Sequence, residues 1–99
     1  MIETRYFGDI FVTNSRIIFV DRKLQTEFSL PFNIIDHIFY KKRCFAPNFI
    51  KILSSENDDH ILWNLEFEGD GASQFKHQLK KSSIAEKVSN ESFLSGGFS

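Results

Sequence analysis

The sequence predicts a mostly β domain with one α-helix near its C-terminal end. Three short apolar runs within residues 8–32, separated by two polar turns, are typical of an antiparallel meander. Residues 60–68 alternate between apolar and polar side chains, which indicates a half-buried strand. Ala72, Phe75 and Leu79 then recur at the spacing of one helical stripe. Strands followed by one late helix favour an antiparallel sheet that the helix caps.

The meander is predicted to contain strands in residues 10–12, 17–20 and 28–32. Asn14 and Ser15 favour the first turn because their side chains hydrogen-bond to nearby backbone groups. β-branched and aromatic residues suit the second strand. The third strand alternates between large apolar and polar residues, so one of its faces is expected to be buried.

Three further strands are predicted in residues 34–40, 48–53 and 60–68. Basic residues and a proline close the first of these. The strongly polar run SSENDD at residues 54–59 is predicted to be the loop of a hairpin that joins the other two.

The helix is predicted to begin after Asp70, whose carboxylate would accept hydrogen bonds from the first free amides. Ser82 and Ser83 mark its expected end. Beyond them, Ile84, Ala85 and Val88 have the spacing to extend the helix, and residues 95–97 are typical of a flexible tail.

Ten residues form the predicted core, taken from the apolar faces of these elements. They are Ile18, Phe28, Leu30, Ile38, Ile50, Trp63, Leu65, Phe67, Phe75 and Leu79. The chain contains twelve Phe residues, and burying one Phe side chain contributes about 1.5–3 kcal/mol. A small domain can build its core from such residues.

Length and composition define the class of protein. At 99 residues the chain has room for one domain, and a hydrophobic share of 41% is too high for a disordered chain. The single cysteine, Cys44, cannot form an internal disulfide, which favours a reducing compartment. The N-terminus lacks a signal-peptide pattern, and no apolar run approaches the roughly 20 residues of a membrane span. We therefore expect an intracellular chain.

Charge is distributed unevenly along the chain, although the formal net charge is −1. Residues 1–53 carry eight Lys and Arg against five Asp and Glu, a net of +3, and residues 54–99 carry four against eight, a net of −4. An acidic or phosphorylated partner is therefore expected on the first half.

Four motifs occur in order along the chain. The pattern G-x-I/L-x-V/L-T-x-x-R-I/V-I-F covers residues 8–19, and FSLPF follows at residues 28–32. FAPNFIK occupies residues 45–51, and GASQF opens the predicted helix at residues 71–75. In this order and spacing they resemble the GRAM domain, a variant of the pleckstrin-homology fold, over residues 7–81. The likeness is greater to the WW-domain-binding protein 2 family.

The resemblance implies a pleckstrin-homology-like barrel, or an open antiparallel sheet, capped by the helix. It places the domain in residues 1–83 and leaves residues 84–99 as a helix extension and tail. It also implies a non-enzymatic adaptor that binds membrane phosphoinositide or a protein partner, with a link to transcriptional coactivation in relatives. The expected location is the cytoplasm, with peripheral membrane or nuclear association.

Two departures from the family pattern limit this inference. Relatives have a longer segment before the glycine at position 8, so residues 2–7 replace part of the first strand or the sheet has an open edge. An open edge favours the alternative function, a purely protein–protein interaction domain without lipid binding, and it would also permit dimerisation. Pro31 and Pro47 are isolated, and the Pro-Pro-x-Tyr motif is missing. WW-domain binding is therefore not expected.

The candidates for binding an anionic ligand lie in two predicted loops. Arg22 and Lys23 occupy the first, and Lys41, Lys42 and Arg43 occupy the second. If the loops share one end of the fold, they make a site for a lipid headgroup or an acidic peptide. The alternative is ordinary solvated charge at turns.

Other chemistry has little support in the sequence. The three His residues and Cys44 lack the spacing of a metal or nucleophilic site, so no metal, cofactor or catalytic residue is expected. Arg16 is expected to be structural, with its stem on the sheet and its head group paired with a carboxylate. Aromatic residues among cations at residues 40–45 suggest nucleic acid only weakly, and the acidic second half argues against it.

Overall fold

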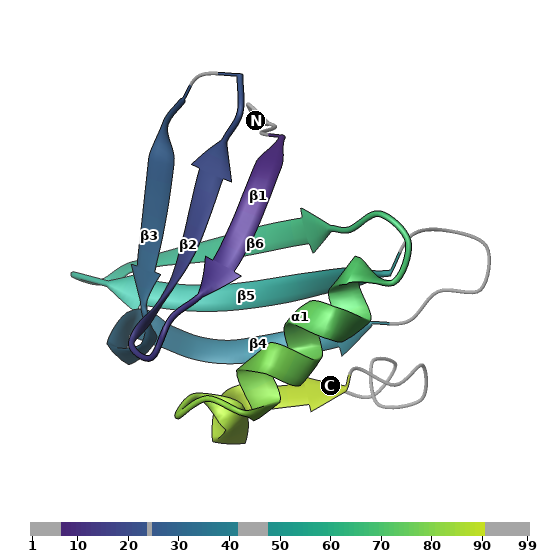
Figure 1. The fold of residues 1–99 in the computed structure, drawn as a ribbon. Helices are drawn as coiled ribbons and strands as arrows, with labels where there is room; N and C mark the ends of the chain where they lie inside the picture. The colour runs from purple at the N-terminus through teal and green to yellow at the C-terminus, as the bar shows by residue number, and fades with distance from the viewer. Residues whose placement is uncertain (1–6, 24, 42–47, 91–99) are drawn as a thin grey trace.

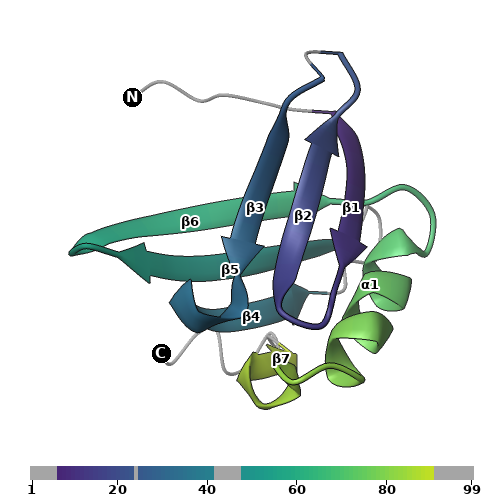
Figure 2. The same cartoon turned by 60° about the vertical axis from the view of Figure 1, so that its left-hand side comes forward.

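A computed structural model describes residues 7–23, 25–41 and 48–90 of the chain. These residues form a three-stranded sheet in the order β1-β2-β3 and a four-stranded sheet in the order β6-β5-β4-β7. The two sheets face each other with their strands crossing, and α1 lies beside them (Figures 1 and 2). The prediction of a mostly β fold with one α-helix is confirmed.

The three-stranded sheet is the predicted meander of β1 (Gly8–Val12), β2 (Arg16–Asp21) and β3 (Glu27–Pro31). Thr13 closes the first turn: its hydroxyl accepts from the Arg16 amide at 3.0 Å and donates to the Arg16 carbonyl at 3.1 Å. The polar side chain that stabilises this turn is therefore Thr13.

The prediction that Ile18 is the core residue of β2 is wrong. Ile17 is only 2% exposed and belongs to the core, whereas Ile18 lies on the opposite face and is half-buried. Because the run of residues 17–20 is apolar throughout, its pattern does not distinguish the two faces. Asp21, at the end of the same buried row, is 3% exposed.

The second sheet is built on β4 (Ile35–Lys41), β5 (Phe49–Glu56) and β6 (Asp59–Glu66), with the 3₁₀ turn η1 (Phe32–Ile34) before β4. Both hairpin strands extend into the predicted six-residue loop, which shortens it to Asn57 and Asp58. These two residues have φ angles of 53° and 69°. Two consecutive left-handed residues are typical of a type I′ turn, which matches the twist of the strands.

The helix α1 (Gly71–Lys80) buries Ala72, Phe75 and Leu79, as its spacing predicts. Asp70 is the N-cap residue, but its side chain makes no capping hydrogen bond to the backbone. Both carboxylate oxygens instead accept from Gln74 Nε2 at 3.1 Å. The predicted capping role of the Asp70 side chain is therefore wrong.

The predicted helix extension is also wrong, because α1 ends at Lys80. The 3₁₀ turn η2 (Ala85–Lys87) and the strand β7 (Val88–Asn90) follow, and β7 pairs with β4 in parallel. Lys87 links this segment to β4, since its Nζ donates to the Ile35 carbonyl at 2.6 Å. Ile84 and Val88 are 2% and 6% exposed, so they belong to the hydrophobic core.

The core lies between the crossed sheets and α1. Of the predicted core residues, Ile38, Ile50, Phe75 and Leu79 are buried in it, and Leu30, Trp63, Leu65 and Phe67 pack against it half-buried. Phe28 is half-buried and lines a cavity described below. Ile17, Ile35 and Ile52 are fully buried core residues that the sequence reasoning did not name.

Candidate functional site

The outer face of the four-stranded sheet carries two lysines around a phenylalanine ring. Lys41 pairs with Phe49 across the β4–β5 ladder, and Phe39 pairs with Lys51. Cross-strand partners lie on the same face of a sheet. The Nζ atoms of Lys41 and Lys51 lie 5.8 and 5.5 Å from the Phe49 ring centroid. We call Phe39, Lys41, Phe49 and Lys51 the basic–aromatic face.

Exposed aliphatic residues continue this face toward the middle of the sheet. Leu53 and Leu62 are opposite each other in the β5–β6 register and are 37% and 50% exposed. Two large aliphatic side chains with this exposure add apolar area beside the lysines. The surface is therefore amphipathic, with aromatic and aliphatic groups next to ammonium groups.

A polar cluster lies at the other end of the same face. The Ser55 hydroxyl donates to the Asp36 carboxylate and lies 2.8 Å from His60 Nδ1. In a nucleophilic triad the imidazole lies between the hydroxyl and the carboxylate. Here the hydroxyl lies in the middle, and the cluster is exposed. Its geometry does not match nucleophilic catalysis.

Arg22 lies in the β2–β3 turn and is paired with Asp9 of β1. Its Nε donates to Asp9 Oδ2 at 3.0 Å, and its second terminal nitrogen lies 2.5 Å from Oδ1. The hydrogen bond from Arg22 lowers the pKa of Asp9, and the same bond raises the pKa of Arg22. Because Asp9 offsets the charge of Arg22, this turn offers less free positive charge than its sequence indicates.

Of the second group of candidate cations only Lys41 is described, and it does not lie at the same end of the fold as Arg22 and Lys23. The turn with Arg22 and Lys23 lies at the top of the three-stranded sheet, and Lys41 lies lower, at the end of β4 (Figures 1 and 2). The Lys23 amide donates to Asp21 Oδ1 at 2.9 Å. Lys42 and Arg43 lie outside the described residues. Sequence reasoning missed Lys51, although Phe49 and Lys51 have the i, i+2 spacing that places them on one strand face.

Arg16 is placed on the outer surface of the three-stranded sheet. One terminal nitrogen of its guanidinium donates to the Ser29 hydroxyl of β3 at 3.1 Å. The contact of its guanidinium among the described residues is therefore a hydroxyl, where the sequence predicted a carboxylate. The arginine still links β2 to β3.

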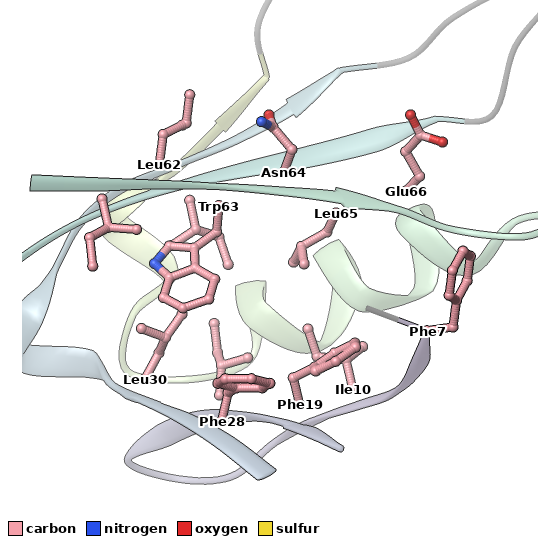
Figure 3. A pocket seen from close by; sticks show the side chains of 13 residues that line it. Phe7, Ile10, Phe19, Phe28, Leu30, Leu62, Trp63, Asn64, Leu65 and Glu66 are labelled. Carbon is pink, nitrogen blue, oxygen red and sulfur yellow. The ribbon is translucent and has the colours of Figure 1, made fainter. Parts of the chain in front are cut away.

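A cavity of about 510 Å³ lies between the two sheets. Figure 3 shows Trp63 and Leu65 of β6 projecting toward Ile10, Phe19 and Phe28 of the three-stranded sheet. All of the lining residues except Asn64 and Glu66 are apolar. Such a lining suits apolar side chains of a ligand.

The described residues contain no group of three or more His, Cys, Asp and Glu placed to hold a metal ion. His37 contacts Ser89 at 2.9 Å, and His60 belongs to the polar cluster described above. Cys44 lies outside the described residues. In the described part of the chain, no helix is long and apolar enough to span a membrane.

A three-stranded antiparallel sheet crossed by a mixed four-stranded sheet, with one helix near the C-terminal end, defines a small pleckstrin-homology-like β domain. The family model of the GRAM domain matches residues 2–85. This chain therefore belongs to the GRAM domain family, whose members are membrane and protein interaction modules. Comparisons with curated proteins and with solved structures give no match.

Proposed function

We propose that this chain is a non-enzymatic adaptor that binds anionic membrane lipid, with phosphoinositide headgroups as its ligand class. The observation that carries the proposal is the basic–aromatic face, where Lys41 and Lys51 flank Phe49. Each cation close to an anionic leaflet contributes about 1 kcal/mol. The exposed leucines beside them add apolar area for the membrane interface.

The remaining candidate cations have secondary roles in this proposal. Lys42 and Arg43 follow Lys41 directly in sequence and lie outside the described residues, so their part in the proposal rests on the sequence alone. Arg22 and Lys23 contribute less, since Asp9 pairs with Arg22. The same proposal includes three further statements about this chain. It is related to the WW-domain-binding protein 2 family, it has a role in transcriptional coactivation, and it is located in the cytoplasm and nucleus. The proposal includes no catalytic step and no cofactor.

Vesicle co-sedimentation tests the membrane proposal. Phosphoinositide-containing vesicles should bind the chain at about 50 mM salt and release most of it at about 500 mM salt, because salt screens exposed charges. The Lys41→Gln/Lys51→Gln variant should bind about 10- to 30-fold more weakly. The variant with Lys41, Lys42 and Arg43 changed to Ala should show a similar loss.

A matched control removes the same charge elsewhere. Lys80→Gln/Lys81→Gln alters two exposed lysines at the C-terminal end of α1, an element that contributes no residue to the basic–aromatic face; Lys80 also donates to the Val88 carbonyl at 3.5 Å, so the fold of this variant is checked first. This control should bind vesicles within about twofold of wild type. If both double variants lose affinity equally, the interaction is general charge attraction and the site assignment is wrong.

A second candidate function is protein interaction through an exposed sheet edge, without lipid. The observation that favours it is the apolar cavity beside β6, the end strand of the four-stranded sheet among the described residues. An edge strand offers backbone donors and acceptors to another chain. A protein partner that binds equally well with and without vesicles would support this function.

A further inference from the structure

A histidine lies on the same sheet face as the lysines of the proposed membrane surface. His60 of β6 is exposed and pairs with Ser55 of β5, two positions along the ladder from the exposed Leu53–Leu62 pair. Because alternate residues of a strand share a face, His60 and Leu62 both project from the outer face of the four-stranded sheet. The imidazole therefore belongs to the amphipathic surface that runs from Lys51 through the two leucines.

The hydrogen bonds of Ser55 identify the nitrogen of His60 that carries a proton. The Ser55 hydroxyl has one hydrogen, which it donates to the Asp36 carboxylate. A hydroxyl that has donated its hydrogen can only accept from a second partner. Nδ1 of His60 lies 2.8 Å from the same oxygen, so Nδ1 is the donor and carries the proton. Nε2 is then the nitrogen without a proton when the ring is neutral.

Protonation of His60 requires no rearrangement of these hydrogen bonds. The second proton goes to Nε2, and no described residue forms a hydrogen bond with that atom. The bond from Nδ1 to Ser55 and the bond from Ser55 to Asp36 are the same in the neutral and the charged form of the ring. Histidine is the side chain that ordinarily changes charge between about pH 5 and about pH 8. Acidification therefore adds one positive charge to this face without changing its contacts.

Negative charge surrounds the end of the face where His60 lies. The carboxylates come from β4, from both hairpin strands and from the turn between them, and they are Asp36, Glu56, Asp58 and Asp59. An anionic membrane is repelled by such a group at neutral pH. A positive charge on His60 offsets part of this repulsion, while Lys51 attracts the membrane from the other end of the face. Membrane contact therefore extends from the lysines toward the hairpin as the pH falls.

The other two histidines differ from His60 in their surroundings. His37 lies on the same face of β4 and is half-buried, with its Nε2 at 2.9 Å from the Ser89 hydroxyl and its ring centroid at 4.4 Å from that of Phe39. These contacts hold its ring against its neighbours and leave less of it available to a membrane. His77 is exposed on α1, an element that contributes no residue to the basic–aromatic face. His60 is therefore the histidine that combines exposure with a position on the proposed membrane surface.

We propose that His60 makes membrane binding by this chain pH-dependent, so that an anionic leaflet is bound more tightly in a mildly acidic medium. This inference rests on the proposed membrane function and adds its regulation. Because the added charge acts on the leaflet as a whole, it requires no particular headgroup. One added cation close to an anionic leaflet should strengthen binding about fivefold.

Co-sedimentation with vesicles of phosphatidylserine and phosphatidylcholine tests the inference, because these lipids keep a constant charge between about pH 7.5 and about pH 5.5. The full chain should bind about fivefold more tightly at the lower pH. His60→Gln should lose most of this gain, and the matched control His77→Gln should retain it. A full gain in the His60→Gln variant, a gain that His37→Gln removes instead, or no vesicle binding at either pH would overturn the proposal.

A separate set of vesicles distinguishes this inference from the proposed function. Phosphoinositide vesicles at neutral pH measure the proposed function alone. If the chain binds them but gains no affinity for phosphatidylserine vesicles on acidification, the proposed function stands and the inference is wrong. If the acid-dependent gain is present and His60→Gln removes it, the inference is supported even when phosphoinositide vesicles are not bound, and the proposed ligand class is then wrong.

NMR of the ring nitrogens of His60 supplies an independent measurement. Nδ1 should carry a proton at both pH values, and Nε2 should gain its proton on acidification. A neutral ring with its proton on Nε2 would contradict the direction of the hydrogen bond to Ser55 and would overturn the proposal.

Discussion

At the scale of single residues, Gly8 explains why the opening motif begins with glycine. It pairs with Asp21 in the β1–β2 ladder. A Cβ atom at position 8 would lie 1.8 Å from the Val20 carbonyl oxygen. Because that neighbour is backbone, a larger residue forces β1 and β2 apart. The motif glycine is therefore a packing requirement of the meander.

Gly8→Ala should lower the free energy of unfolding by about 2–3 kcal/mol, as expected for overpacking against rigid backbone. Urea denaturation measures the change. Gly69→Ala is the matched control: Gly69 has a φ angle of +57°, and a Cβ there meets open space. Its cost should be about 1 kcal/mol, from backbone conformation alone. A larger cost at Gly69 than at Gly8 would contradict this account.

The Asp9–Arg22 pair predicts a pH dependence of stability. The hydrogen bond from Arg22 lowers the folded-state pKa of Asp9 below its ordinary value of 3.8. The pair therefore stabilises the fold fully above about pH 4, and this contribution disappears as the pH falls through the lowered folded-state pKa. Asp9→Asn should be less stable than wild type at pH 7, and this difference should shrink toward about pH 2.

Thermal unfolding between about pH 7 and about pH 2 measures that difference. Arg22→Gln should show the same convergence with wild type. The Asp9→Asn/Arg22→Gln double variant should cost less than the sum of the single changes at pH 7, because both singles remove one interaction. A stability difference that persists unchanged at low pH would show that the carboxylate charge is not its source.

At the scale of elements, β2 is a strand whose buried face was not evident from its sequence. Ile17 is 2% exposed and belongs to the core, and Ile18 points the other way. Ile17→Ala should therefore cost about 2–5 kcal/mol, from lost burial and the cavity left behind. Ile18→Ala should cost less than about 1 kcal/mol. Chemical denaturation of both variants measures the two losses of unfolding free energy and so identifies the buried face of β2. A larger loss for Ile18→Ala than for Ile17→Ala would support the sequence-based choice of Ile18.

The elements also show what the sequence could predict. Alternation correctly placed the half-buried faces of β3 and β6, and helical spacing correctly placed Ala72, Phe75 and Leu79. β7 was missed because a three-residue strand carries no period of its own. It is defined by long-range pairing with β4. The Asp70 cap was predicted from residue type, which does not reveal that Gln74 binds the carboxylate.

The candidate site was less predictable than the fold for a similar reason. The sequence identified Lys41 as a cation of interest but assigned it to a loop with other cations. Its placement beside Phe49 and near Lys51 depends on the register of β4 against β5. The placement of His60 beside Ser55 likewise depends on a hairpin register. Neither can be read from residue types alone.

At the scale of the whole molecule, the two proposed binding surfaces lie on different sides of one sheet. The basic–aromatic face is on the outer side of the four-stranded sheet, and the cavity is on the side that faces the other sheet (Figure 3). Lys41, Phe49 and Lys51 belong to the outer surface alone, and Leu62 is common to both surfaces, with its side chain on the outer face and the residue at the border of the cavity. In the proposed function, such a fold would hold a membrane and a protein partner together.

This arrangement predicts that lipid and a protein partner bind independently. A saturating concentration of such a partner should change vesicle affinity by less than about twofold, which corresponds to negligible coupling between the sites. Co-sedimentation with labelled partner measures both ligands in one experiment. Lys41→Gln/Lys51→Gln should release the vesicles and retain the partner. A tenfold effect of the partner on vesicle affinity would show that the surfaces are coupled.

The parallel pairing of β7 has a consequence for the co-translational folding of this protein. Ile38 of β4 pairs with Val88, fifty positions later in the chain. The meander and the β5–β6 hairpin join neighbouring segments, so each can form while the nascent chain is still growing. The edge of β4 that pairs with β7 stays without this partner strand until Asn90 has emerged from the ribosome. Until then this edge of β4 can pair with a neighbouring nascent chain, so β4 is an aggregation-prone segment during translation.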